Sequence, residues 1–217
     1  MSDYGFQIRR DDGKLFASPD FTPSVLYAIE NITVPGALTR KVVKTNIKYS
    51  STALIFYYCT NSNKSAQFFT VNQDGMLAIN CLNEDSMNLV LYIFDNKVRY
   101  STDYGIFIYR SGSLIYTANC IPLVIKTATI PTNSNGPSGK FAVASGPAGD
   151  AVNVINEKDA IYVGYANTAN QSGISSSVCV TYSVDPSSSA SMGEGNYPVQ
   201  YIDRALYDKY RKSAIGY

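Results

Sequence analysis

The chain has 217 residues, of which 45% are hydrophobic and only 16% are charged, and its formal net charge is +1. Average soluble proteins carry roughly 25% charged residues, so this surface must be rich in Ser, Thr, Asn and Tyr, which suits contact with another protein or a glycan. Because 18 basic residues nearly balance 17 acidic ones and no long basic run occurs, the composition disfavours nucleic-acid binding.

Strand-like segments recur along the chain as short runs of β-branched and aromatic residues, separated by turn signals such as Asp74-Gly75 and Ser111-Gly112. This spacing predicts an all-β fold, an antiparallel β-sandwich over residues 1–185. In chain order, the predicted strands are 4–8, 24–29, 53–58, 67–71, 76–81, 88–94, 105–109, 114–116, 123–127, 140–144, 160–165 and 177–184. Two stretches rich in Gly, Pro, Ser or Asn, 131–139 and 146–150, are predicted to be loops.

Two runs, 53–58 and 89–94, are apolar at consecutive rather than alternate positions. Consecutive apolar residues indicate strands that are covered on both faces. We expect a second sheet on one face and a neighbour on the other, either a loop of the same chain or another subunit.

The last part of the chain changes character after residue 185. Residues 186–196 are rich in Ser and Gly and predict a linker, and residues 197–217 predict a short C-terminal helical tail. Ile202, Leu206 and Tyr210 succeed one another at intervals of four, which places them on one helix face. This stripe is expected to dock on its own domain, with insertion into a partner as the alternative.

Segments 4–16 and 104–116 repeat one pattern: Tyr-Gly, an apolar strand, an Arg, a glycine turn and a second apolar strand. Glycine supplies the positive φ that a tight hairpin turn requires. The segments C-terminal to the two copies do not align with each other. This internal repeat therefore predicts two similar hairpins, which belong either to one sandwich or to two related hairpin lobes.

The hairpin pattern resembles the small β-sandwich tail proteins of lambda-like siphoviruses, which are tailed bacteriophages. The matching residues are Tyr4-Gly5-Phe6-Gln7-Ile8, Asp12-Gly13 and Phe16-Ala17-Ser18, and the later copy lacks the closing serine. The resemblance implies a virion structural protein at the tail tip or central tail fibre, present in several copies or as a homo-oligomer and bound to other tail proteins. It carries over no catalytic residue.

Catalytic chemistry has little support in the sequence. The chain contains no histidine, the commonest general base and metal ligand, so we expect no enzyme activity, no metal and no cofactor. The carboxylate pairs Glu84-Asp85 and Glu157/Asp159 are the remaining route to hydrolysis, and both are predicted to be solvated loops. The cysteines are predicted to be buried and reduced, because each lies in or beside an apolar stretch and no CxxC pair occurs. They are Cys59, Cys81, Cys120 and Cys179.

No signal peptide and no transmembrane helix is expected, because no positive leader precedes an apolar core and no run approaches 18 apolar residues. The chain is thus expected to be made in a cytoplasm, and the resemblance to phage tail proteins implies a host cytoplasm and residence in the virion tail.

The candidate partner contacts combine paired tyrosines with the helical stripe, since tyrosine offers apolar area and a hydroxyl group together. The leading hypothesis is a non-enzymatic structural protein of the phage tail. Two rivals stay open: a carbohydrate- or host-receptor-binding module, and a polysaccharide-cleaving enzyme. The candidate contacts are Tyr57, Tyr58, Ile202, Leu206 and Tyr210.

Overall fold

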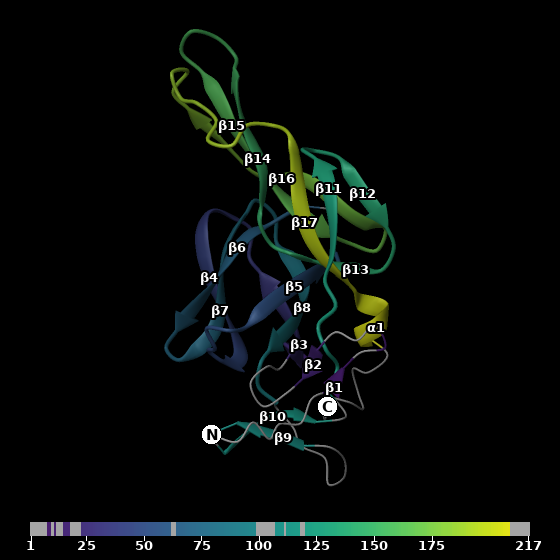
Figure 1. The fold of residues 1–217 in the computed structure, drawn as a ribbon. Helices are drawn as coiled ribbons and strands as arrows, with labels where there is room; N and C mark the ends of the chain where they lie inside the picture. Colours follow the sequence, from purple (N-terminus) through teal and green to yellow (C-terminus); the bar gives the residue numbers. More distant parts are fainter. Residues whose placement is uncertain are drawn as a thin grey trace, which may run out of the picture.

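The computed structural model describes residues 8–9, 11, 15–17, 23–61, 64–98, 107–110, 112–117 and 120–208. Within them the chain is built from antiparallel strands and one short helix (Figure 1). The predicted all-β, sandwich-like class is confirmed.

The largest sheet has six strands in the order β11-β17-β13-β5-β8-β3, and each strand is antiparallel to its neighbours. Since β17 lies between β11 and β13, the last described strand completes the interior of the sheet instead of extending its edge. The six strands are β3 (Val25–Val34), β5 (Leu54–Cys59), β8 (Met87–Asp95), β11 (Lys126–Pro131), β13 (Phe141–Ala144) and β17 (Asn196–Asp203).

Two smaller sheets contribute to the main core against one face of the large sheet, with orders β4-β7-β6 and β12-β16-β15-β14. The core joins Tyr57 and Leu91 of the large sheet to Leu77 of β7 and Ile174 of β16. The strands of these two sheets are β4 (Ala37–Lys48), β6 (Gln67–Gln73), β7 (Met76–Asn83), β12 (Asn135–Ser138), β14 (Pro147–Val154), β15 (Ala160–Ala169) and β16 (Gly173–Val184).

The opposite face of the large sheet carries a second core, which explains the consecutive apolar residues of β5 and β8. Tyr57 belongs to the main core, whereas its neighbours Phe56 and Tyr58 belong to the second one. The cover on this face comes from Ile121 and Tyr207 of the same chain. The prediction of strands buried on both faces is confirmed, and the neighbour is intramolecular.

The helix α1 (Arg204–Asp208) is shorter than the predicted tail, and residues 197–203 belong to β17, which corrects the helical assignment there. Asp203 marks the helix start, because its carboxylate accepts a hydrogen bond of 3.2 Å from the Ala205 amide. Docking on the chain's own sheet is confirmed, with Tyr207 fully buried. Residues 209–217 lie outside the described part of the chain.

The internal repeat of segments 4–16 and 104–116 corresponds to two antiparallel hairpins. One pairs β1 (Ile8–Arg9) with β2 (Leu15–Ala17), and the other pairs β9 (Phe107–Arg110) with β10 (Ser113–Thr117). Gly112 has a φ of 78° at the second turn, as the pattern predicts. Each hairpin forms its own two-stranded sheet.

Three strands occupy segments where the sequence predicts loops or no strand. The predicted loops 131–139 and 146–150 contain β12 and the start of β14, and β4 was not predicted. Most described side chains of β4 face solvent, and Thr45 and Ile47 are the buried ones among them. An exposed strand needs no apolar alternation, so the sequence of β4 resembles a loop.

Candidate interaction site

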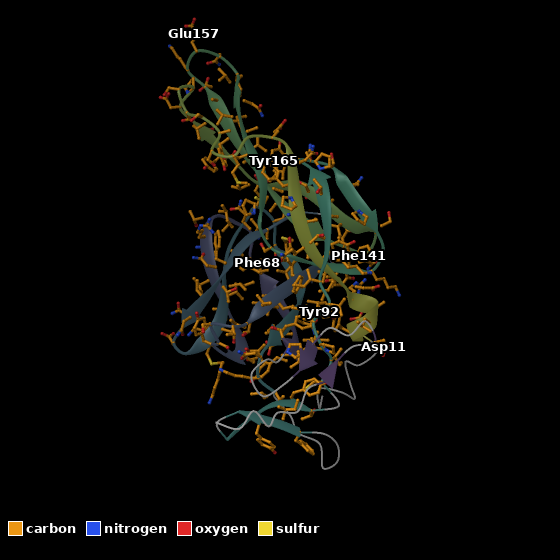
Figure 2. All side chains as sticks on the ribbon, viewed as in Figure 1. Asp11, Phe68, Tyr92, Phe141, Glu157 and Tyr165 are labelled. Carbon is orange, nitrogen blue, oxygen red and sulfur yellow. The ribbon has the colours of Figure 1, made fainter. Side chains whose placement is uncertain are left out.

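The strands β14, β15 and β16 extend into an arm that projects beyond the sandwich (Figure 1). Its tip is the turn between β14 and β15, and Figure 2 shows Glu157 at the end and Tyr165 nearer the body. Asn156 organises the turn: its side-chain oxygen accepts hydrogen bonds from the amides of Lys158 at 2.8 Å and Asp159 at 3.0 Å. The arm therefore ends in an ordered turn.

The arm exposes large apolar side chains close to its tip. Val154 is 60% exposed and Ile155 is 61% exposed. Tyr182, which lies in the part of β16 that belongs to the arm, is 43% exposed. Apolar groups gathered on a projecting element are typical of surfaces that bind other molecules.

The strand register places Val154 and Tyr182 on the same face of the arm. Val152 lies opposite Tyr162, and Tyr162 lies opposite Tyr182. Directly opposite residues of antiparallel strands point to the same side of the sheet. The rings of Tyr162 and Tyr182 stack with centroids 4.8 Å apart. A row of apolar side chains thus crosses the arm from β16 to β14.

Asp150 fastens the loop between β16 and β17 to the base of the arm. Its buried carboxylate accepts hydrogen bonds from the Ser191 hydroxyl at 2.6 Å and from the amides of Ser191, Met192 and Gly193 at 2.8–2.9 Å. The Tyr162 hydroxyl donates another at 3.2 Å. The segment predicted as a free linker is therefore fixed at residues 191–193.

The hydrogen-bond donors around the Asp150 carboxylate determine its pKa. Burial favours the protonated form of Asp150, but the hydrogen bonds from Ser191, Met192 and Gly193 outweigh it and hold the pKa of the carboxyl well below its usual range. Burial, together with the negative charge of Asp150, raises the pKa of Tyr162 to about 12. Asp150 is thus an ionised anchor that stiffens the arm.

A separate hollow of about 490 Å³ lies between the β11–β12 turn and the β15–β16 turn. Segments 133–138 and 172–177 line it together with Asn170, and none of the lining side chains is charged. The turns are tied to each other, because the Asn133 amide donates to the Ser176 hydroxyl at 3.2 Å and the Ser176 amide donates to the Ser134 carbonyl at 2.8 Å. Amide and hydroxyl groups in a fixed concave surface suit a neutral polar ligand.

A second hollow of about 440 Å³ lies beside α1 and includes the predicted contact Tyr58. The Arg204 guanidinium lies 3.7 Å from the centre of the Tyr58 ring, a cation–π contact. Asp208 accepts hydrogen bonds from Arg204 at 3.4 Å and from the Tyr92 hydroxyl at 2.5 Å. Burial and the nearby carboxylate raise the pKa of Tyr92. This cluster attaches the helix to the sheet.

The remaining predicted contacts lie mostly inside the fold. Tyr57 and Ile202 are fully buried and Tyr58 is 7% exposed, which corrects their assignment as partner contacts. Leu206 is partly buried against the second core, and Tyr210 lies outside the described residues. The sequence did not single out Tyr182, which is exposed on the arm, or the buried Asp150, which holds the loop at its base. The alternation in 178–184 was the signal for the strand that carries Tyr182.

The carboxylate pairs occupy different turns. Glu84-Asp85 comes directly after β7, whereas Glu157 and Asp159 lie in the tip of the arm. Within the described residues, no group of three or more His, Cys, Asp or Glu side chains is placed to hold a metal ion. The thiols of Cys59, Cys81 and Cys179 are buried and that of Cys120 is partly buried, and none of the four forms a disulfide.

The fold and this surface define an all-β, sandwich-like protein with a projecting apolar arm. Comparison of the chain with family models, with curated proteins and with solved structures finds no match. No helix in the described ranges is long and apolar enough to cross a membrane.

Proposed function

We propose that this protein is a non-enzymatic structural protein of a tailed-phage virion, made in the host cytoplasm and located at the tail tip or tail fibre, where its arm binds other tail proteins. The observation that carries the binding role is the exposed apolar tip, formed by Val154, Ile155 and Tyr182. The tail setting rests on the resemblance of residues 4–18 to siphovirus tail proteins.

The arm has the physical properties of a binding element. Tyrosine and β-branched residues bury apolar area at little conformational cost, and aromatic residues dominate the energetics of protein interfaces. The Asp150 anchor holds the loop of residues 191–193 against the base of the arm, so little order has to be gained when a partner binds. Binding through surface contact needs no catalytic group.

Incorporation into particles tests this function. A tagged chain produced during infection is expected in purified virions at a fixed ratio to the tail proteins, measured by mass spectrometry. Replacing Ile155 and Tyr182 together by Asp and Ser should remove it from particles while leaving its circular dichroism unchanged. The matched control Asp185→Asn changes an exposed residue of the β16–β17 loop and should be incorporated normally. Wild-type chain that is absent from particles would contradict the proposal.

A carbohydrate- or host-receptor-binding module is the second candidate, and the uncharged hollow of 133–138 and 172–177 favours it. In that case a glycan array should show binding by the wild-type chain. Ser175→Tyr, which fills the hollow, should abolish the signal, whereas Ile155→Asp at the arm tip should retain it. Binding lost only in the arm variant would argue against the hollow.

A further inference from the structure

The strand β14 forms one edge of the four-stranded sheet, since β15 is its neighbour on one side and no described strand pairs with the other. In antiparallel pairs, successive residues alternate between facing the partner strand and facing away from it. The Ile155 amide donates to the Asp159 carbonyl at 2.9 Å, in the same register as the rest of the hairpin. The backbone amides and carbonyls of Ala151 and Asn153 therefore point toward β15. Those of Asp150, Val152 and Val154 point away from it, toward the open edge.

The outward groups are only partly used. The Asp150 amide donates to the Gly193 carbonyl at 3.2 Å, as its outward direction requires. Within the described part of the chain, the amides of Val152 and Val154 have no backbone acceptor. An open stretch of strand edge, centred on Asn153, is left near the arm tip. Such edges pair readily with another strand.

We propose that this stretch pairs with the same stretch of a second copy of the chain, antiparallel about a twofold axis at Asn153. This inference rests on the proposed binding role of the arm, and it names a second copy of the chain as the partner of the β14 edge. Val152 and Val154, one on each side of Asn153, both present an amide and a carbonyl outward, so the edge can form hydrogen bonds with a second copy of itself. Val152 of each copy lies opposite Val154 of the other and exchanges a pair of hydrogen bonds with it.

The side chains agree with this register. Val152 and Val154 lie on the face that also carries Tyr162 and Tyr182, so pairing extends the apolar row of one arm into that of the other. Opposed β-branched residues on one face stabilise a strand pair. Residues 151–156 contain no charged side chain, so the twofold axis brings no like charges together.

The base of the arm limits the pairing. Gly193 already occupies the edge beside Asp150, and the tip turn ends the strand on the other side. A twofold contact that uses the same edge on both copies is closed, so it produces a dimer instead of a filament. Only the short stretch around Asn153 is available.

Crosslinking through a new cysteine tests the register directly. At the proposed axis Asn153 faces its own counterpart in a non-hydrogen-bonded pair, where Cα atoms are about 4.5 Å apart, within disulfide range. Asn153→Cys, in a Cys120→Ser background, should form a disulfide dimer under mild oxidation, read on a non-reducing gel. The matched control is Ser183→Cys, which is exposed on the same sheet face but lies two strands away from β14. Equal and weak crosslinking of both variants would overturn the proposal.

Sedimentation equilibrium gives a second, independent measurement. The wild-type chain should dimerise with increasing concentration, and Val152→Pro should raise the dimer dissociation constant at least tenfold, because proline removes an outward amide but no hydrogen bond of the hairpin. Val152→Lys, which keeps the amide but adds charge to the edge, should weaken the dimer likewise. Circular dichroism verifies the fold of each variant.

A chain that is monomeric at all concentrations, or a Val152→Pro variant that dimerises like the wild type, would overturn the self-pairing. The virion measurement separates the two proposals. Monomeric chain found in particles would contradict the self-pairing alone, and a dimer of this register that is absent from particles would support the pairing and contradict the tail role.

Discussion

The ring of Tyr207 meets the ring of Phe94 edge to face, with 5.0 Å between their centroids. Its hydroxyl accepts a hydrogen bond from the Val124 amide at 2.9 Å and donates one to the Pro122 carbonyl at 3.2 Å. One side chain of α1 thus joins the helix, the 122–124 segment and β8, and it is fully buried.

Tyr207→Ala should destabilise the protein by about 3–5 kcal/mol, because it leaves a cavity between the helix and the sheet. Tyr207→Phe keeps the ring and loses only the hydroxyl, so we expect a smaller cost of about 1–3 kcal/mol from the hydrogen bonds left unmade. Urea unfolding monitored by tyrosine fluorescence measures both. Equal stability of the Ala variant and the wild type would show that the helix is not anchored by this residue.

Asp150→Asn should lower the free energy of unfolding by about 1–3 kcal/mol, because the amide turns its own N–H donors toward a site that offers only donors. The control Asp185→Asn changes an exposed aspartate whose hydrogen bonds stay within its own loop, and we expect little effect on unfolding. Urea unfolding at pH 7 compares the three proteins. A stability loss that is the same in both variants would argue against a special role for Asp150.

The stability difference between wild type and Asp150→Asn should depend on pH. The pKa of Asp150 is lower in the folded chain than its ordinary value of 3.8, so the folded state binds fewer protons there than the unfolded state. The contribution of the ionised carboxylate is fully present above pH 3.8 and is lost as the pH falls toward the depressed folded pKa. Urea titrations at pH 7, 5 and 3 should show a constant difference at first and a smaller one at pH 3.

Gly36 connects β3 to β4 where the backbone passes the β7–β8 turn. A Cβ at this position would lie 2.3 Å from the Glu84 carbonyl oxygen and 2.8 Å from the Ser86 nitrogen. Gly36→Ala should cost about 1–3 kcal/mol, because backbone atoms have to move. Gly146→Ala, where no atom lies within 4 Å of the added carbon, is the matched control and should be nearly neutral in thermal unfolding. Comparable losses at both sites would contradict the close approach.

The cysteines should differ in reactivity toward a thiol reagent such as DTNB at pH 8. Burial raises the pKa of Cys81 and of Cys179 to about 12, and Cys59 is buried as well. The thiolate is the reacting form, so the partly buried Cys120 should react first and the others only after unfolding in urea. Cys120→Ser should remove the fast phase. A fast phase that persists would place an accessible thiol elsewhere.

Much of the fold is predictable from the sequence because its interior strands are strongly apolar. The runs 53–58 and 89–94 mark β5 and β8 at the centre of the sandwich, and Asp74-Gly75 marks the turn between β6 and β7. The exposed strand β4 carries no such signal, since pairing supplies its stability and solvent accepts its polar side chains.

Only part of the predicted helix stripe lies on the helix. A periodicity of four starting at Ile202 assumes that the helix begins before residue 202, but the chain is still extended there. Because α1 begins at Arg204, Tyr207 enters the core from the helix. The strand–helix boundary depends on pairing with β11 and β13, which no local pattern records.

The candidate site was less predictable than the fold. Asp150 lies in a glycine-containing stretch that resembles a loop, and its donors come from residues 191–193, about forty positions later in the chain. Contacts of such separation leave no trace in local composition. The alternation in 160–165 and 178–184 did identify two of the three strands of the arm.

The position of β17 between β11 and β13 sets the timing of folding during synthesis. The two strands that it separates are made long before it, and they cannot join across the gap until residues 196–203 have emerged from the ribosome. Pairings between segments far apart in the chain close slowly and late. The six-stranded sheet is thus completed only after residues 196–203 have been made, and until then the edges of β11 and β13 that face β17 are open to other strands.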